Sequence, residues 1–252
     1  MEVVITSSPG EVAADAISGH VHPGAVLGLA TGSSPLPVYE ELLRRRDAGT
    51  LSFDGVRAFT LDEYLGLPRS HPQSYHSVIR RDFTDRAGIE VDGPDGEAKD
   101  VPAEAARYEA AIAAAGGIDV QLLGIGTDGH IGFNEPGSSL ASRTRTKTLT
   151  PQTRQDNARF FDSVEEVPVH VLTQGLGTIL DARHVVLVAT GATKAAAVAA
   201  AVEGPVSAFC PASVLQLHPH VTFVVDPDAA SELRLLDYYR FTVAHKPDWQ
   251  PW

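Results

Sequence analysis

The sequence predicts an α/β fold: a doubly wound, mostly parallel central sheet with helices on both faces, of a modified Rossmann-like kind. Two observations predict it. Short apolar runs without polar alternation recur along the chain, as in strands that are buried on both faces of a parallel sheet. Between them lie segments with helical apolar spacing that end at glycine, so strands and helices alternate.

The expected strands follow one another as VVIT at 3–6, AVLGLA at 25–30, VRAFTL at 56–61, IDVQLLGIG at 118–126, VHVL at 169–172, HVVLVAT at 184–190 and VTFVVD at 221–226. The expected helices lie at 35–49, 101–117 and 191–204. Because the carboxyl ends of parallel strands meet at one edge of a sheet, the loops that follow four of these strands should lie together. These loops are TGSSP, DEYLGLP, GTDGHIGFNEP and GATK.

Length and composition indicate one α/β domain over residues 1–252, since 43% hydrophobic and 21% charged residues are the balance of a globular protein. A net charge of −12 argues against nucleic acid as the main partner, because binding it needs clustered lysine and arginine. Cys210 is the single cysteine, which excludes an internal disulfide framework, and we expect it to be a small buried hydrophobe.

The first residues, MEVVITSSPGEVAADA, are acidic and interrupted at Pro9 and Gly10, unlike a signal peptide. No apolar run reaches the length of a membrane span. We therefore expect a cytoplasmic protein without a membrane partner.

A dense group of proton-active side chains lies in GIGTDGHIGFNE at 124–135. Its glycines match the G-x-G-x-x-G of dinucleotide-binding loops, but no helical pattern follows and TKTLT stands where the ribose-binding acid belongs, so we reject that interpretation. Asp128, His130 and Glu135 can form a proton relay, because a carboxylate fixes the tautomer of a nearby imidazole and stabilises its charged form. A metal site with few ligands and a structural histidine bonded to backbone remain alternatives.

The other loops offer a base and phosphate donors. In LDEYLGLP, Asp62 and Glu63 are adjacent and point apart, so one is expected to face a ligand while the other caps or pairs nearby. In TGSSP, glycine and hydroxyls near a helix start can bind phosphate, although turns of this composition are also common without a ligand. Candidate cations for an anionic ligand, each also interpretable as a solvated surface charge, are Lys194, Arg159, Arg145 and Lys147.

These motifs together resemble the glucosamine-6-phosphate deaminase family over nearly the whole chain. The resemblance includes LGLATGSSP, FTLDEYLGLP, HPQSYHSVI, GTDGHIGFNEPGSSLASRTRTKTLT, GLGTILDA and VEGPVSAFCPASVLQLHP, in that order. It implies conversion of glucosamine 6-phosphate and water into fructose 6-phosphate and ammonia in amino sugar catabolism, with no cofactor and no metal. The broader relatives, the 6-phosphogluconolactonases, share a DGH turn but generally lack the FNEP continuation.

The resemblance also implies residue roles. His130 assists opening of the sugar ring, with Asp128 and Glu135 tuning and orienting it, and Asp62 is the base that moves a proton between C2 and C1. Hydrolysis of the resulting imine at C2 releases ammonia. The substrate phosphate is bound by Gly32, Ser33, Ser34, Arg159 and Lys194.

Some family members are hexamers activated by N-acetylglucosamine 6-phosphate at a second site between subunits. Ser138, Arg145 and Lys147 match the loop of that site, whereas a tyrosine that the family carries near the C-terminus has no clear match in LDYYRF. A homo-oligomer is therefore implied without fixing the hexamer or the activation.

Two other functions stay open at this point. A 6-phosphogluconolactonase-like hydrolase or another sugar-phosphate isomerase would use the same fold. A sugar-phosphate sensor without catalysis would also use it, although Asp62, Asp128, His130 and Glu135 are all retained and no DNA-binding segment is evident.

Overall fold

The computed structural model describes residues 1–247, 249–250 and 252, and its main feature is a seven-stranded sheet in the order β1-β10-β9-β6-β2-β3-β5. Every neighbouring pair in this sheet is parallel. The strands are β1 (Glu2–Ile5), β2 (Val26–Leu29), β3 (Arg57–Thr60), β5 (Glu90–Asp92), β6 (Val120–Leu123), β9 (His184–Ala189) and β10 (Val221–Val225). The predicted doubly wound α/β fold is confirmed.

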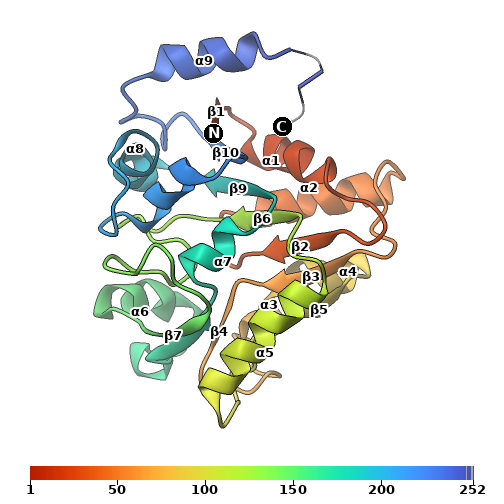
Figure 1. Cartoon of the computed structure of the whole chain (residues 1–252), viewed down its shortest axis with the longest axis vertical. Coiled ribbons are helices and arrows are strands. Elements are labelled where there is room, and N and C mark those ends of the chain that lie inside the picture. Colours follow the sequence, from red (N-terminus) through yellow and green to blue (C-terminus); the bar gives the residue numbers. More distant parts are fainter. Residues whose placement is uncertain (248, 251) are drawn as a thin grey trace.

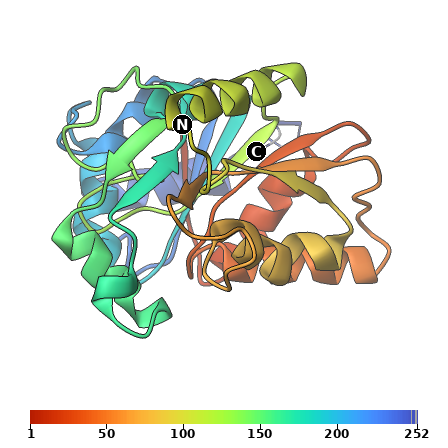
Figure 2. The same cartoon turned by 90° about the horizontal axis from the view of Figure 1, so that it is seen from below.

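Helices cover both faces of the sheet, as Figure 2 shows with α5 on one side and α1 and α2 on the other. The α-helices are α1 (Pro9–Ser18), α2 (Leu36–Asp47), α3 (Tyr75–Ile79), α4 (Asp85–Ala87), α5 (Val101–Ala114), α6 (Pro151–Asn157), α7 (Leu176–Leu180), α8 (Ala195–Glu203) and α9 (Leu236–Ala244). Short turns of 3-10 helix are η2 (Ala158–Phe160), η3 (Val164–Glu166), η4 (Ala192–Lys194) and η5 (Pro211–Leu217), and η1 (Arg80–Thr84) is a π-helical turn that joins α3 to α4. The three predicted helices correspond to α2, α5 and α8.

The continuous apolar runs bury both faces of their strands. Along β9, Val185 and Leu187 pack in the core beneath α5, α7 and α8, whereas Val186 and Val188 pack in the core beneath α1 and α2. Successive strand residues point to opposite faces, so a strand between two helical layers must be apolar throughout. This explains why the runs show no alternation.

A second sheet projects from the carboxyl edge of the first (Figure 1). Its strands β4 (Asp62–Tyr64), β8 (His170–Thr173) and β7 (Arg145–Thr148) are antiparallel, in the order β4-β8-β7. The prediction that the run 169–172 joins the parallel sheet is therefore wrong. A short apolar run shows only that a strand is buried, and β8 is buried by a small cluster around Tyr64, Phe133 and Val171 instead of by two helical layers.

The expected meeting of four loops at one edge is confirmed, because β9, β6, β2 and β3 are consecutive in the sheet. DEYLGLP differs from expectation in that its first residues form β4 instead of a loop. In the described part of the chain, no helix is both long and apolar enough to cross a membrane.

Candidate active site

The glycines of the loop after β6 allow the chain to fold back on itself. The N–H of Gly126 donates to the carbonyl of His130 at 2.9 Å, and a Cβ at Gly126 would lie 2.3 Å from the His130 ring. Gly129 has a φ of +85°, and a Cβ there would also lie 2.6 Å from Cys210 Sγ. Both positions therefore exclude other residues, and the glycines make room for an imidazole over its own loop.

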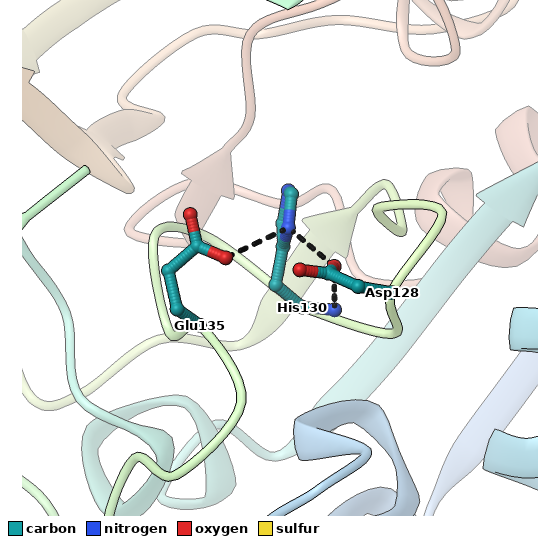
Figure 3. A group of neighbouring side chains, drawn as sticks. All are labelled: Asp128, His130 and Glu135. Atoms are coloured by element: carbon teal, nitrogen blue, oxygen red, sulfur yellow. Dashed lines mark hydrogen bonds and ion pairs between the residues drawn. The ribbon is translucent and has the colours of Figure 1, made fainter. Parts of the chain in front are cut away.

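Asp128 and Glu135 converge on one nitrogen of His130 (Figure 3). Asp128 Oδ1 lies 2.7 Å from His130 Nδ1 and also accepts the backbone N–H of His130 at 3.1 Å. Glu135 Oε2 lies 3.7 Å from the same Nδ1. The two carboxylates favour a proton on Nδ1, which leaves Nε2 free to exchange a proton with a ligand.

The two carboxyl groups differ in acidity. The contact with His130 lowers the pKa of Asp128, whereas burial raises the pKa of Glu135 against the opposing hydrogen bond from Thr153. One carboxylate thus stays ionised while the other changes protonation more readily, a division typical of acid and base sites. The three predicted residues are brought into contact in a geometry suited to proton transfer.

The same three side chains are of the types that bind metal ions, and one possible ligand atom of each lies within 4.8 Å of the others. Two ligands at roughly 2.0 Å from a tetrahedral zinc ion would be separated by about 3.3 Å. The 2.7 Å between Asp128 Oδ1 and His130 Nδ1 is shorter than this and is the distance of a close ion pair between the two side chains. The spacing therefore favours the relay over the metal site.

Asp62 and its neighbour Glu63 have different surroundings, and Glu63 takes the capping role that the sequence predicted for one of the two. Glu63 accepts the backbone N–H groups of Tyr64, Tyr75 and His76 at 2.8, 2.9 and 2.9 Å and so caps the start of α3. Asp62 is 4% exposed, and burial together with the charge of Glu63 raises its pKa well above the ordinary value. A buried carboxylate of this kind is a stronger base than one in water.

Asp62 is joined to the histidine loop through β8. It pairs with Thr173 across the antiparallel sheet, and the Thr173 hydroxyl accepts the backbone N–H of Phe133 at 3.2 Å. Gly132, with a φ of +54°, lies close enough that a Cβ would be 3.0 Å from that hydroxyl. The second sheet thus holds the base and the relay in fixed relation.

Of the predicted phosphate residues, Gly32, Ser33 and Ser34 follow β2 and Lys194 follows β9, whereas Arg159 lies in η2, exposed, with its guanidinium 4.7 Å from the centre of the Phe160 ring. Gly32 has a φ of +102°, which favours glycine, Ser33 is exposed and Ser34 is half-buried. Lys194 ends η4 and directly precedes α8. Burial and, to a smaller extent, the charge of Arg159 lower the pKa of Lys194, whereas the charges of Asp156 and Asp128 raise it. Lys194 therefore shares an electrostatic neighbourhood with Arg159 and the relay, and a bound anion would stabilise both cations.

Arg145 and Lys147 lie on one face of β7, near the Glu135 end of the relay, since Arg145 bonds Asn134 and the charge of Glu135 acts on Lys147. Burial lowers the pKa of both, and each is half-buried. Arg145 Nη1 donates to Asn134 Oδ1 at 2.7 Å, and Ser138 is 2% exposed. The second site stays a prediction.

Two residues that sequence reasoning missed hold the site together. Asn134 is fully buried and donates to the carbonyls of Ile131 and Gln174 at 2.9 Å each. Thr153 donates to Glu135 Oε1 at 2.5 Å. The T-x-x-T spacing of Thr150 and Thr153, a helix start signal, was the one available indication for the second.

A comparison with protein families matches residues 8–224 to the family described as Glucosamine-6-phosphate isomerases/6-phosphogluconolactonase. Two relatives named glucosamine-6-phosphate deaminase match over 99% of both chains. The protein from Arthrobacter sp. (strain FB24) is 66% identical over 258 residues, and that from Rhodococcus jostii (strain RHA1) is 64% identical over 257.

Solved structures agree with this family. A structure described as a monomeric glucosamine-6-phosphate deaminase is 42% identical with a TM-score of 0.89, and the match covers 92% of this chain and 100% of that one. The 6-phosphogluconolactonase from Trypanosoma brucei is 22% identical with a TM-score of 0.71, covering 92% and 98% of the two chains. At that identity, the likeness to the lactonase shows the fold alone.

Proposed function

The chain belongs to the family of glucosamine-6-phosphate isomerases and 6-phosphogluconolactonases, and from this membership we propose that it is a glucosamine-6-phosphate deaminase. Its reaction converts glucosamine 6-phosphate and water into fructose 6-phosphate and ammonia. The observation that carries the proposal is the convergence of Asp128 and Glu135 on His130 at the sheet edge where the buried Asp62 also lies.

Binding of the substrate phosphate is assigned to five residues at the carboxyl edge of the sheet and in η2, which together form the phosphate end of the site. The backbone N–H groups and hydroxyls of Gly32, Ser33 and Ser34 supply hydrogen bonds, while Lys194 and Arg159 supply charge. Two cations beside such a loop attract a sugar phosphate locally, although the whole chain carries a net charge of −12, because salt screens the more distant acidic surface.

Ring opening is assigned to His130. The cyclic sugar opens when the O1 hydroxyl loses a proton and O5 gains one, and Nε2 of one imidazole can accept the first proton and return it to O5. The positive charge that develops on the ring is balanced by Asp128 and Glu135 at Nδ1. The two carboxylates thereby stabilise the charged intermediate state of the histidine.

Isomerisation is assigned to Asp62. Its carboxylate removes the proton from C2 and delivers it to C1, while a proton passes from the amine nitrogen to the carbonyl oxygen O1, so the amine at C2 becomes an imine and the aldehyde becomes a primary alcohol. One rigidly held base that reaches both carbons suffices, and β4 supplies that rigidity. Water then adds to the imine carbon and ammonia leaves, so the reaction consists of proton transfers and hydrolysis, for which no cofactor is required.

A purified sample should be assayed for ammonia release from glucosamine 6-phosphate and, in parallel, for hydrolysis of 6-phosphogluconolactone. The proposal predicts ammonia and fructose 6-phosphate in equal amounts and little lactone hydrolysis. Rapid lactone hydrolysis without ammonia would favour the lactonase, and binding of the phosphosugar without turnover would favour a sensor.

The cluster of Ser138, Arg145 and Lys147 is proposed to bind a second phosphosugar, the acetylated activator of some relatives. The half-buried cations support this role because they lie together on β7. Saturation curves with and without N-acetylglucosamine 6-phosphate test it, and identical curves would contradict it. Sedimentation in the same buffer would distinguish a homo-oligomer from a monomer like the solved relative.

A further inference from the structure

The two oxygens of Glu135 have different neighbours. Oε1 accepts a hydrogen bond from Thr153 Oγ1 at 2.5 Å, and Oε2 lies 3.7 Å from His130 Nδ1. Oε2 is buried and, among the described residues, has no aligned hydrogen-bond partner. The orientation of this carboxylate toward His130 therefore depends on what holds its other oxygen.

Thr153 is itself held by the first turn of α6. Thr150 is the N-cap of this helix, and its hydroxyl accepts the backbone N–H of Thr153 at 3.1 Å. The two hydroxyl oxygens are 2.9 Å apart. If Thr150 donates to Thr153, the Thr153 hydroxyl proton is directed to Glu135, and the helix backbone fixes the whole chain of hydrogen bonds.

The other end of α6 is tied to the strand that carries Asp62. Asn157 Nδ2 donates to the Tyr64 hydroxyl at 3.1 Å, and α6 continues directly into η2 with Arg159. Arg154 donates to the carbonyls of Val164 and Val167 at 2.8 and 2.9 Å, which closes the segment after η2 onto α6. One short helix thus contacts the relay, the strand of the base and the phosphate end.

We propose that Thr153 is a positioning residue of the deaminase site, whose hydroxyl orients Glu135 so that Oε2 faces His130 Nδ1. The inference rests on the proposed function, because it concerns the same relay. Thr153 is 6% exposed and contacts Glu135 instead of the substrate, so it acts through that carboxylate.

The hydroxyl has an effect that a methyl group of the same size cannot replace. Burial raises the pKa of Glu135, and the hydrogen bond from Thr153 opposes this increase. Without the bond, the carboxylate would be both free to rotate and more readily protonated, and a protonated Glu135 cannot balance the charge on His130. The loss should be greatest on the acidic side of the pH profile.

The test uses Thr153→Val, which keeps the shape and removes the hydroxyl, with Thr153→Ser as the rescue. Thr84→Val is the matched control, because Thr84 is 1% exposed and its hydroxyl has no hydrogen-bond partner among the described residues. We expect Thr153→Val to lower kcat about tenfold with little change in KM. The acidic limb of the pH profile of kcat should also move to higher pH. Thr153→Ser should restore most of kcat, and Thr84→Val should match wild type.

An unchanged kcat and pH profile in Thr153→Val would overturn the role of Thr153, and so would a loss that is equal at all pH values and not rescued by Thr153→Ser. Thr153→Ala provides a second variant without the hydroxyl if Thr153→Val does not fold. Wild-type protein that releases no ammonia would instead overturn the proposed function itself, so the two failures are distinguishable.

Discussion

Two histidine clusters lie at opposite edges of the same sheet and differ in their partners. At the carboxyl edge, His130 Nδ1 faces the carboxylates of Asp128 and Glu135. At the amino edge, His184 begins β9, and its Nδ1 lies 2.8 Å from Nε2 of His20 while its Nε2 lies 2.9 Å from the Thr222 hydroxyl. The first cluster can balance a proton gained by the ring, whereas neither partner of His184 carries a negative charge.

Burial increases this contrast. His184 is 2% exposed, and burial lowers its pKa to about 4, whereas the His130 side chain is 23% exposed. His184 therefore stays neutral near neutral pH and serves packing and hydrogen bonding. The charge of the partners and access to solvent thus distinguish a histidine that is suited to proton transfer from one that is suited to stabilising the fold.

The largest change in activity is expected from a substitution in the cluster at the carboxyl edge. His130→Gln should reduce turnover of the cyclic substrate by about 10²- to 10⁴-fold, since it removes the proton carrier for ring opening, and should leave thermal stability nearly unchanged. Steady-state kinetics on the cyclic substrate and on an open-chain analogue measure this, with His22→Gln as the control at an exposed histidine. An equal loss on both substrates would contradict a ring-opening role.

Acid should lower the free energy of unfolding through the histidine at the amino edge. Because folding lowers the pKa of His184 from 6.5 to about 4, the unfolded chain binds more protons between these pH values. The contribution of His184 is complete above pH 6.5 and is lost as the pH falls toward 4, by up to about 3 kcal/mol. Because folding also shifts the pKa of other groups, such as His76 and Asp62, urea unfolding is compared between wild type and His184→Leu at pH 7 and at pH 5. Wild type should lose more free energy of unfolding than the variant, and an equal loss in both would contradict the role of His184.

The smallest effect is expected from removing the amino-edge hydrogen bonds at neutral pH. His184→Leu leaves Thr222 and His20 without their partner and should lower the free energy of unfolding by about 2 kcal/mol, with kcat and KM unchanged. It should also reduce the acid dependence described above. His22→Leu is the matched control, and a kinetic defect in His184→Leu with normal stability would reverse the assignment of the two clusters.

Much of the fold could be predicted because its signal is local. The apolar runs of β1, β2, β3, β6, β9 and β10 are buried on both faces. Because helices alternate with these strands, the strands run parallel and the loops at their carboxyl ends share one edge of the sheet. The antiparallel sheet could not be predicted in this way. Its strand β7 reads RTKT, with half-buried and exposed residues in alternation, and β4 is only three residues long.

The candidate site was predictable where chemistry is concentrated in one loop and not where partners are distant in sequence. Asp128, His130 and Glu135 are close along the chain, so their contact could be expected from spacing. Thr153 reaches Glu135 across 18 residues, and Asn134 reaches Gln174 across 40. Threonine and asparagine are common in turns, and only the tertiary structure shows which of them contact Glu135 or close the loop around it.

Ammonia release from glucosamine 6-phosphate should be compared between wild type and Asp62→Asn, with substrate binding measured on the same samples. Wild type should release ammonia and fructose 6-phosphate together. The variant should bind the phosphosugar almost normally and lose about 10²- to 10⁴-fold in turnover. Near wild-type turnover in Asp62→Asn would contradict the assignment of the base, and no ammonia from wild type would contradict the deaminase function.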